Sequence, residues 1–533
     1  MEAYLSKREE LISEDRALRP DGFASKSLTP DERKADEILR TVRAAEAESV
    51  WGLDRKSNHP HGSQQMFPGM EFLTARKTIM GTKIFDILSK MPKGGLLHVH
   101  LDATVRADVL LKLALQQPAM HVRISGALAL NSFKTVLPEF RALPQSQWTQ
   151  IAGITDAQHV PGSWVPIQNA RNNFDKAMGG PEGFDQWVIG SLMIDPSEAY
   201  HTHNTGAKIW EKFESTFGVS GGLILNMSIF AEYIREFLLS SIEDGVSYVE
   251  PRILFWDKFM VGEDGEQNVP HRVWVQTFER VMNEVRAKMH AQGRDDEFVG
   301  ARIVYSTVRV CESSELEWFL EDCLALAKEF PHLIAGFDLV GHEDSLKPLI
   351  YYYEPLTKFA ERQKEEGVNI PFMFHAGETC GDGSPADLNL YDAILLGTKR
   401  IGHGFSIYKH PKLMEICKEK GICIEMCPIS NEILRFTGSM PMHPLPAVLN
   451  HGVHVALCSD DPSIFGNMGL SFDFFQVFVS SEVSGIATLR SFVWDSIKFS
   501  SLDDEEKKEA YGKLERRWTT FIRYIIDTYG RSM

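Results

Sequence analysis

The run GGLLHVH at residues 94–100 opens the part of the chain that decides the fold. It is a nearly continuous apolar stretch that ends in polar side chains, and seven similar runs follow it. They are VSYVEPR (246–252), VGARIVYSTVR (299–309), LIAGFDLVG (333–341), IPFMFHAGE (370–378), RIGHG (400–404), GICIEMCP (421–428) and VHVALCSDD (453–461). Amphipathic stretches such as SELEWFLEDCLALAKEF (314–330) separate most of these runs. Apolar runs that alternate with helices are typical of buried parallel strands.

Eight strand–helix units favour an α/β protein with a (β/α)8 TIM barrel, which we place at residues 93–485. An open, doubly wound sheet is the alternative. However, no G-x-G-x-x-G follows the first run, and polar residues collect at the C-terminal ends of several runs, where barrel active sites lie. The barrel is therefore the fold that we expect.

Residues 1–92 are predicted to form a helical arm in front of the barrel. The charged stretch at 30–47 and the more amphipathic stretch at 71–91 predict two helices. Between them, the segment 57–70 is rich in Pro, Gly and polar residues and predicts a loop.

An insertion is expected between the first and second strands, because about 145 residues separate them whereas later gaps are roughly 20–50. We place this insertion at residues 118–205, near the catalytic end of the barrel. Residues 486–533 predict further helices that pack on the barrel. One of them carries an apolar stripe typical of core packing or of an oligomer contact: Leu514, Trp518, Phe521, Ile522, Ile525 and Ile526.

The composition argues against polyanionic and membrane partners. The 533 residues include 56 Lys+Arg and 73 Asp+Glu, which gives a formal charge of −17 without a block of basic residues. No run of about 18 apolar residues occurs, and the first twenty residues lack the apolar core of a secretion signal. All seven cysteines follow residue 310 at irregular spacing, which predicts reduced thiols. We expect a cytoplasmic protein with a small-molecule ligand, no nucleic-acid partner and no membrane partner.

His98 and His100 form one of three H-x-H triplets, and they are the pair that ends an apolar run. Side chains two residues apart on a strand point to the same face, so both imidazoles can enter the mouth of the barrel. Taken alone, the pair fits either metal ligands or hydrogen-bonded structural histidines. The other triplets, at 59–61 and 201–203, lie in predicted loops.

The ends of other predicted strands support the interpretation as a metal site, because they carry His375, Glu378, His403, Asp460 and Asp461. Burying this many unmatched ionisable groups costs several kcal/mol, so a site explains the clustering better than packing. Three imidazoles and one carboxylate suit a catalytic divalent metal, most simply Zn²⁺. This set is His98, His100, His375 and Asp460. No Lys ends the fourth strand, so we expect one metal ion per chain rather than two.

The motifs HVHLDA (98–103), GFDLVG (336–341), HAGE (375–378), RIGHG (400–404) and SDDP (459–462) resemble, in this order, those of the adenosine deaminase superfamily. Finer features resemble the adenosine deaminase-related growth factor subfamily: MPKGGLLHVH (91–100), CPISNEIL (427–434) and SDDPSIFG (459–466). The resemblance implies a (β/α)8 barrel that binds one zinc, forms a homodimer through its N-terminal helices, and hydrolyses adenosine to inosine and ammonia.

The resemblance also implies a role for each matching residue. His98, His100, His375 and Asp460 would hold zinc, Glu378 would protonate purine N1, and His403 would orient and help deprotonate the water that attacks C6. Asp461 would bond to N7, and Gly341 would offer its backbone N–H to N3. Asp102 would accept a bond from a ribose hydroxyl, and Trp210 would line the ribose end. Relatives are usually secreted, but this chain has no cysteine before Cys311 and no secretion signal, so we do not expect an extracellular role.

The predicted function is therefore zinc-dependent deamination of adenosine and 2′-deoxyadenosine. The first alternative is deamination of AMP or ATP, for which His201, His203 or Lys208 of the insertion region could bind the phosphate. Asp102 argues against this alternative because a carboxylate repels a phosphate. Free adenine would leave Asp102 without a partner. A binding or signalling protein on a deaminase scaffold is the alternative from a different class.

Overall fold

The computed structural model describes residues 1–52, 66–156 and 158–530. Its central parallel strands form two arcs that close into a ring. The first arc runs β1 (Gly94–His100), β5 (Val246–Leu254), β9 (Ile303–Val308) and β10 (Ile334–Val340), with the short β8 (Gly300–Ala301) beside β5. The second runs β11 (His375–Ala376), β12 (Arg400–His403), β13 (Cys423–Met426) and β14 (Val455–Leu457). Parallel bridges between Val99 and Asp460 and between Phe337 and Phe372 join the arcs at both edges. The predicted (β/α)8 barrel is confirmed.

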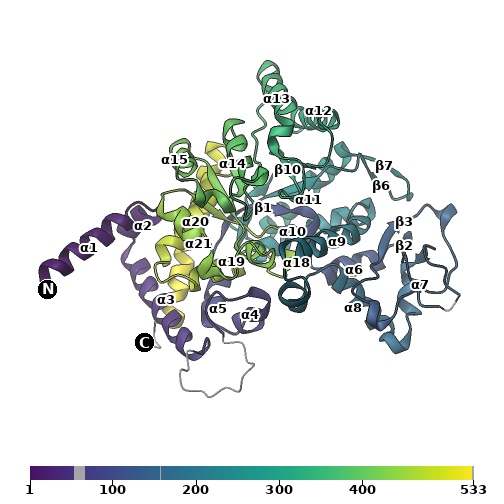
Figure 1. The fold of residues 1–533 in the computed structure, drawn as a ribbon, viewed down its shortest axis with the longest axis horizontal. Coiled ribbons are helices and arrows are strands. Elements are labelled where there is room, and N and C mark those ends of the chain that lie inside the picture. The colour runs from purple at the N-terminus through teal and green to yellow at the C-terminus, as the bar shows by residue number, and fades with distance from the viewer. Residues whose placement is uncertain (53–65, 157, 531–533) are drawn as a thin grey trace.

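Helices cover the outside of this ring (Figure 1). The helices that precede or connect the strands are α10 (Met227–Glu243), α11 (His271–Ala291), α12 (Ser313–Glu329), α13 (Tyr353–Glu366), α14 (Pro385–Leu395), α15 (Pro411–Lys420) and α17 (Leu445–Asn450). Each presents one apolar face to the strands. In α12, for example, Leu316, Phe319 and Cys323 recur at helical spacing and are buried. Two short helices stand at the catalytic end, α16 (Pro428–Ile433) and α18 (Pro462–Phe465). A hairpin of β6 (Phe259–Val261) and β7 (Gln267–Pro270) follows β5.

The segment between β1 and β5 contains a small subdomain of its own. After α6 (Ala107–Leu115), the strands β2 (Met120–Arg123), β3 (Glu139–Ala142) and β4 (Val165–Pro166) form an antiparallel sheet in the order β3-β2-β4. The helices α7 (Ile167–Asn172) and α8 (Gly180–Ser191), the π-helical turn η5 (Glu198–Thr202) and α9 (Gly206–Ile224) follow. The backbone N–H of Ile194 donates to the carbonyl of Ile464 in α18. The end of the predicted insertion therefore lies against the chain that follows Asp461.

The N-terminal helices pack partly on the C-terminal ones. The helix α1 (Glu2–Arg16) has no buried residue and projects from the body (Figure 1). After α2 (Asp21–Ser27), α3 (Pro30–Ser49) packs on α21 (Asp504–Tyr529), where the Trp518 indole N–H donates to Glu32. The helix α20 (Ile486–Lys498) packs against α2 and α21, and it follows α19 (Ser471–Val479). Dimerisation through the arm and the cytoplasmic location stay predictions.

The single helix predicted at 71–91 is wrong, because the structure has α4 (Phe72–Ile79) and α5 (Lys83–Ser89) there. Met80, Gly81 and Thr82 separate them, and the Thr82 hydroxyl caps α5 by accepting the N–H of Phe85 at 3.1 Å. A threonine in extended conformation that binds an N–H three residues on begins a new helix rather than continuing one. Most of the predicted loop at 57–70 lies outside the described residues.

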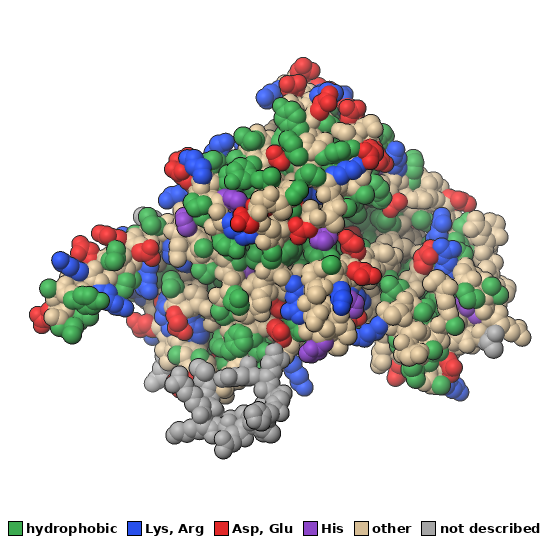
Figure 2. Space-filling view, in the orientation of Figure 1, with side chains coloured by type: hydrophobic (Ala, Val, Ile, Leu, Met, Phe, Trp, Pro, Cys, Tyr) green, Lys and Arg blue, Asp and Glu red, His purple; other side chains and the backbone are tan. Residues whose placement is uncertain are grey.

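Acidic and basic side chains are interspersed over the face shown in Figure 2. Among the described residues, no helix combines the length and the apolar character needed to cross a membrane.

Candidate metal centre and active site

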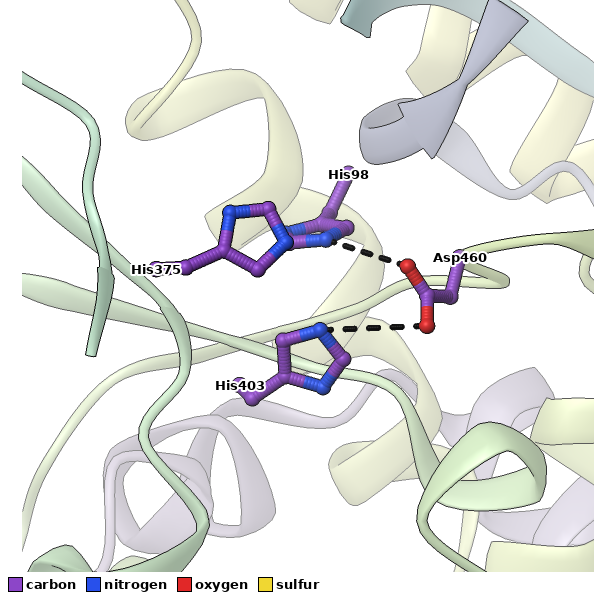
Figure 3. Close-up of side chains that lie close together, drawn as sticks. All are labelled: His98, His375, His403 and Asp460. Atoms are coloured by element: carbon purple, nitrogen blue, oxygen red, sulfur yellow. Dashed lines mark ion pairs between the residues drawn. The ribbon is translucent and has the colours of Figure 1, made fainter. Parts of the chain in front are cut away.

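The barrel strands bring the predicted metal ligands together at their C-terminal ends. His98 and His100 are two residues apart at the end of β1, so their side chains share one face. His375 lies in β11, His403 ends β12, and Asp460 follows β14. Figure 3 shows His98, His375, His403 and Asp460 converging on one point.

The side chains of this cluster are within reach of a common ion. The carboxylate of Asp460 lies 3.3 Å from Nε2 of His98, 3.3 Å from Nε2 of His100 and 3.8 Å from Nε2 of His403. One ligand atom from each of His98, His375, His403 and Asp460 lies within 4.8 Å of all the others, and the same holds for His100, Asp460 and Asp461. All of these side chains are buried except His100, which is partly exposed.

Acidic groups outside the cluster orient two of the imidazoles. Glu425 lies 2.8 Å from Nδ1 of His98, and Asp338 lies 2.7 Å from Nδ1 of His375. A carboxylate on Nδ1 turns Nε2 toward the centre, which is the usual arrangement of a histidine that holds a metal. Arg252 binds both carboxylates, at 2.7 and 2.8 Å.

These ion pairs keep both carboxyl groups charged. Burial alone would raise the pKa of Asp338 and Glu425. The His375 imidazole and Arg252 reverse this effect for Asp338, and two arginines, Arg252 and Arg400, reverse it for Glu425, so both pKa values lie below the ordinary range.

The residues fit a divalent metal. Nε2 of His98 and Oδ1 of Asp460, which lie 3.3 Å apart, are buried and make no hydrogen bond within the described part of the chain, although buried polar atoms are normally satisfied. Burial lowers the pKa of His375 to about 3, so its imidazole is neutral and has a lone pair to offer. Neutral imidazoles with one carboxylate form a donor set that zinc prefers. His403 lies as close to the centre as the predicted ligands, so the division of roles between His100 and His403 stays a prediction.

The backbone at the cluster is strained. His403 and Asp460 have φ angles of 58° and 59°, a region that side chains other than glycine rarely occupy. Gly402 allows a close approach, since a Cβ there would lie 2.9 Å from Cε1 of His98. Such strain is characteristic of functional sites, where the surrounding fold holds the side chains in place.

A cavity of about 300 Å³ opens beside the cluster, and it contains every predicted catalytic and substrate-binding residue. These are Asp102, Trp210, Gly341, Glu378, His403 and Asp461. Its wall includes Phe213, Phe217, Leu254, Val308, Val340 and Leu346, so a flat apolar ligand can pack there. His201, His203 and Lys208 are not among the lining residues.

Two features of the wall follow from local structure. Trp210, on the first turns of α9, stacks on the His342 ring with centroids 4.1 Å apart and an interplanar angle of 9°. Gly341 has a φ of 108°, and a Cβ there would meet Leu346 at 2.7 Å, so the backbone requires glycine.

Two acidic residues of the cavity, Glu378 and Asp461, are protonated more readily than usual. Burial, together with the charges of Asp460 and Glu343, raises the pKa of Glu378. Burial and Asp460 likewise raise the pKa of Asp461. Both carboxyl groups are thereby suited to donate a proton or a hydrogen bond to a ligand nitrogen.

Three residues that were not predicted from the sequence support these side chains. Glu343 accepts the N–H groups of Gly377 and Glu378 at 3.2 and 2.9 Å and so fixes the HAGE turn. On α16, Ser430 donates to Asp460 at 2.7 Å, and Asn431 lies 3.3 Å from Nδ1 of His403. The sequence carried a signal for each group: the HED triplet (342–344) follows GFDLVG, and Ser430 and Asn431 lie in CPISNEIL. The resemblance included CPISNEIL without assigning a role to its residues.

The family model described as adenosine deaminase matches residues 194–516. The chain belongs to the adenosine deaminase family. It is 30% identical to adenosine deaminase 2-A of Danio rerio over 94% of this chain and 95% of that protein. It is 31% identical to adenosine deaminase 2 of Homo sapiens, over 93% and 89% of the two chains. The family membership predicted from the sequence motifs is confirmed, and the chain is an enzyme that hydrolyses C–N bonds.

Solved structures of low identity share the fold of this family member. An adenine deaminase from Arthrobacter aurescens aligns with a TM-score of 0.53 at 16% identity, covering 80% of this chain and 99% of that one. An N6-methyl-AMP deaminase from Arabidopsis thaliana aligns with a TM-score of 0.52 at 15% identity, covering 81% and 98%. A zinc-bound amidohydrolase from Burkholderia ambifaria aligns with a TM-score of 0.51 at 14% identity, covering 84% and 96%. Members of the adenosine deaminase family are metal-dependent enzymes of purine nucleosides or nucleotides, which agrees with the His/Asp cluster.

Proposed function

We propose that the protein is a zinc-dependent hydrolase that converts adenosine and 2′-deoxyadenosine to inosine, 2′-deoxyinosine and ammonia, with one zinc ion per chain. The observation that carries this proposal is the direct contact between the His/Asp cluster and a cavity with protonatable carboxyl groups. The cluster would hold zinc through His98, His100, His375 and Asp460. When bound there, zinc supplies a Lewis acid that makes water nucleophilic at neutral pH.

The other residues would bind the purine and move protons. Glu378, protonated, donates to N1 and so makes C6 electrophilic, while His403 orients the attacking water and accepts its proton. Asp461, also protonated, donates to N7, and the N–H of Gly341 donates to N3. The water oxygen bonds to C6, and the water proton accepted by His403 passes to the amino nitrogen, which leaves as ammonia when its bond to C6 breaks. The second water proton returns to Glu378 as the oxygen on C6 becomes the carbonyl of the product, while N1 keeps the proton that Glu378 donated.

The charge of the cavity favours a nucleoside over a nucleotide. Its described lining includes five carboxyl groups and neither Lys nor Arg: Asp102, Glu214, Glu378, Asp460 and Asp461. Because Glu378 and Asp461 are protonated in this proposal and Asp460 would hold the metal, a 5′-phosphate would be repelled by Asp102 and Glu214. No Lys or Arg of the described lining could bind it. Asp102 instead suits a ribose hydroxyl, which can donate to a carboxylate.

Deamination of AMP is the second candidate, because the Arabidopsis neighbour is named as an N6-methyl-AMP deaminase. Glu214 separates the two candidates. It lies one turn after Trp210 on α9, and partial burial raises its pKa. We expect Glu214→Lys to raise the ratio of kcat/KM for AMP to that for adenosine by about tenfold, the effect of exchanging repulsion for a charged contact. The exposed Glu211→Lys on the same helix is the control and leaves the ratio unchanged.

The deciding experiment follows loss of absorbance at the adenine band with adenosine, 2′-deoxyadenosine, AMP, ATP and adenine, each with and without a chelator. The proposal requires turnover of adenosine well above AMP, its loss with the chelator, and its return with added zinc. Preference for AMP would retain the chemistry and contradict the nucleoside assignment. Turnover that survives complete removal of metal would contradict the role of zinc.

A further inference from the structure

A second cavity, of about 500 Å³, lies at the opposite end of the barrel from the candidate active site. Its residues precede or begin four barrel strands: Arg302 stands before β9, Ile334 begins β10, Arg400 begins β12 and Gly421 stands before β13. The wall is completed by Lys498 at the end of α20, by residues 499–501 of the link to α21, and by Lys507 in the first turn of α21. The N-terminal ends of parallel strands share one end of a barrel, so this cavity is separate from the His/Asp cluster.

The lining is basic although the whole chain carries a formal charge of −17. Five cationic residues line the cavity, and none of its described lining residues is Asp or Glu. They are Arg302, Lys399, Arg400, Lys498 and Lys507. A cavity lining with basic but no acidic residues is unexpected by chance in a protein whose acidic residues outnumber the basic ones. The arrangement therefore needs a physical reason.

Two of these cations are neutralised by carboxylates outside the cavity. Arg302 pairs with Glu506 at 2.6 Å. Arg400 pairs with the buried Glu250 at 2.5 Å and also binds Glu425. These pairs fix the wall, because Glu250 also accepts the N–H of Ser501 at 2.6 Å.

The three lysines of the cavity differ from the two arginines in their partners. Within the described part of the chain, Lys399, Lys498 and Lys507 have no carboxylate within ion-pair distance. The Lys498 amine instead faces the imidazole of His454 at 3.3 Å. Lys507 is half-buried, and burial lowers its pKa, with Arg400 and Arg302 adding to this effect against the opposing charges of Asp504 and Glu250. Ammonium groups around one cavity repel one another, and a bound anion removes that repulsion.

Apolar side chains and neutral hydrogen-bonding groups occupy the rest of the wall. The apolar part comprises Pro331, Ile334, Ala335, Pro371, Met373 and Phe499, while Asn369, Ser500 and Ser501 add polar groups. A ligand here can therefore place a charged group among the lysines and an organic body against the apolar wall.

From this combination, we propose that the cavity at the N-terminal end of the barrel binds a small phosphorylated organic molecule. The phosphate lies among Lys399, Lys498 and Lys507, since a dianion forms charge-assisted hydrogen bonds to several ammonium groups at once. The organic body lies against the partly exposed Phe499 and Pro371. The site is independent of the proposed deamination, because none of its residues lines the first cavity.

Titration calorimetry on the full chain tests this site with two probes, ribose 5-phosphate and inorganic pyrophosphate. We expect saturable binding of one ribose 5-phosphate per chain, weakened by salt. Inorganic pyrophosphate distinguishes an organic phosphate ligand from a simple anion, and it should bind more weakly than ribose 5-phosphate because it cannot use the apolar wall. Tighter binding of pyrophosphate would overturn the organic part of the proposal.

A pair of charge-matched variants locates the site. The triple variant Lys399→Gln, Lys498→Gln, Lys507→Gln should weaken ribose 5-phosphate binding by at least about tenfold, the effect of losing one charge-assisted contact or more. The control changes three exposed lysines elsewhere, Lys112→Gln, Lys288→Gln and Lys364→Gln, and should change binding less than twofold. Equal weakening in both triples would show diffuse attraction and overturn the site, as would absence of saturable binding to the unchanged protein. If the triple variant does not fold, the single exposed Lys399→Gln serves, with an expected loss of at least about threefold.

Discussion

The two ends of the barrel each have a cavity, and largely the same strands line both. Acidic side chains line the catalytic cavity, whereas basic side chains line the opposite one. The described lining of the catalytic cavity has five carboxyl groups and no Lys or Arg, whereas that of the opposite cavity has five cations and no Asp or Glu. In the catalytic cavity, Glu378 and Asp461 have raised pKa values, because they are buried near the charge of Asp460 and no Lys or Arg of the described residues pairs with them. Deeper in the barrel, Glu425 is paired with arginines and has a lowered pKa. Pairing, rather than burial as such, decides whether a buried carboxyl here is a proton donor or a fixed anion.

A short chain of contacts joins the two ends. Arg400, in the wall of the basic cavity, binds one oxygen of Glu425, and the other oxygen lies 2.8 Å from Nδ1 of His98. The buried charges of Arg400 and Glu425 in the middle of the barrel thus fix the orientation of His98 in the metal cluster. Substitutions at the catalytic end should have the largest effects, and substitutions farther from the reacting atoms should have smaller ones.

The largest effect is expected from His375→Ala. Removing this imidazole should abolish metal binding and lower kcat/KM for adenosine by roughly 10³-fold or more, because a metal contributes several kcal/mol to the transition state. Metal content by atomic absorption and initial rates provide the measurement. His332→Ala changes an exposed histidine and is the control. One metal per chain in His375→Ala would refute the ligand assignment.

Glu378→Gln should retain the metal and lower kcat by about 10²–10⁴-fold, because the amide keeps the shape of the side chain but cannot act as a general acid. Steady-state kinetics together with metal analysis separate this effect from that of His375→Ala. Near-normal turnover would remove Glu378 from the proposed proton donor role.

Glu425→Gln tests the buried anion between the two ends. It weakens the orientation of His98 and leaves Arg252 and Arg400 short of a counter-charge. We expect metal affinity to fall by about 10–100-fold and the protein to lose about 3–5 kcal/mol of stability. Metal titration and chemical unfolding measure both effects, with the exposed Glu419→Gln on α15 as the control. A variant with unchanged metal affinity would show that Glu425 stabilises the barrel without supporting the metal.

The smallest effect is expected at Glu432 of α16, a buried carboxyl that accepts bonds from Phe72 N–H and the Tyr200 hydroxyl. Burial raises its pKa to about 8 from an ordinary value near 4.5. The native state therefore binds a proton that the unfolded chain has lost, and stability falls as pH rises between these two values. Glu432→Gln cannot titrate.

At pH 9, Glu432→Gln should therefore be more stable than the unchanged protein by on the order of 2 kcal/mol, relative to the difference at pH 5. Urea unfolding at the two pH values measures this, with the exposed Glu365→Gln as the control. Parallel pH profiles for the variant and the unchanged protein would contradict the raised pKa.

The parts of the fold that the sequence predicted are those governed by local patterns. Apolar runs ending in His, Glu or Asp identified the barrel and placed His98, Glu378 and Asp460 at one end, because strand polarity carries each run's last residue to the same place. The break at Gly81 was missed, because helical periodicity continues across a short interruption.

The groups missed at the site depend on contacts between distant segments. Glu343 supports the HAGE turn from the loop after β10, and Ser430 reaches Asp460 from a different strand end. The basic cavity was invisible for the same reason, since its lysines are far apart in sequence and each is unremarkable alone. Pattern reasoning finds residues that end the same kind of element, and it cannot find partners chosen by tertiary geometry.

The closure of the ring has a consequence for synthesis of the chain. The bridge between Val99 and Asp460 joins the first barrel strand to the segment after the last, and α3 packs on α21 at the far end of the sequence. During synthesis, one edge of β1 therefore stays unpaired until nearly the whole polypeptide has emerged from the ribosome. Contacts of such long sequence separation fold slowly and leave edges open to wrong pairing. The nascent chain should accordingly depend on chaperones, and truncation before α21 should produce insoluble protein rather than a smaller enzyme.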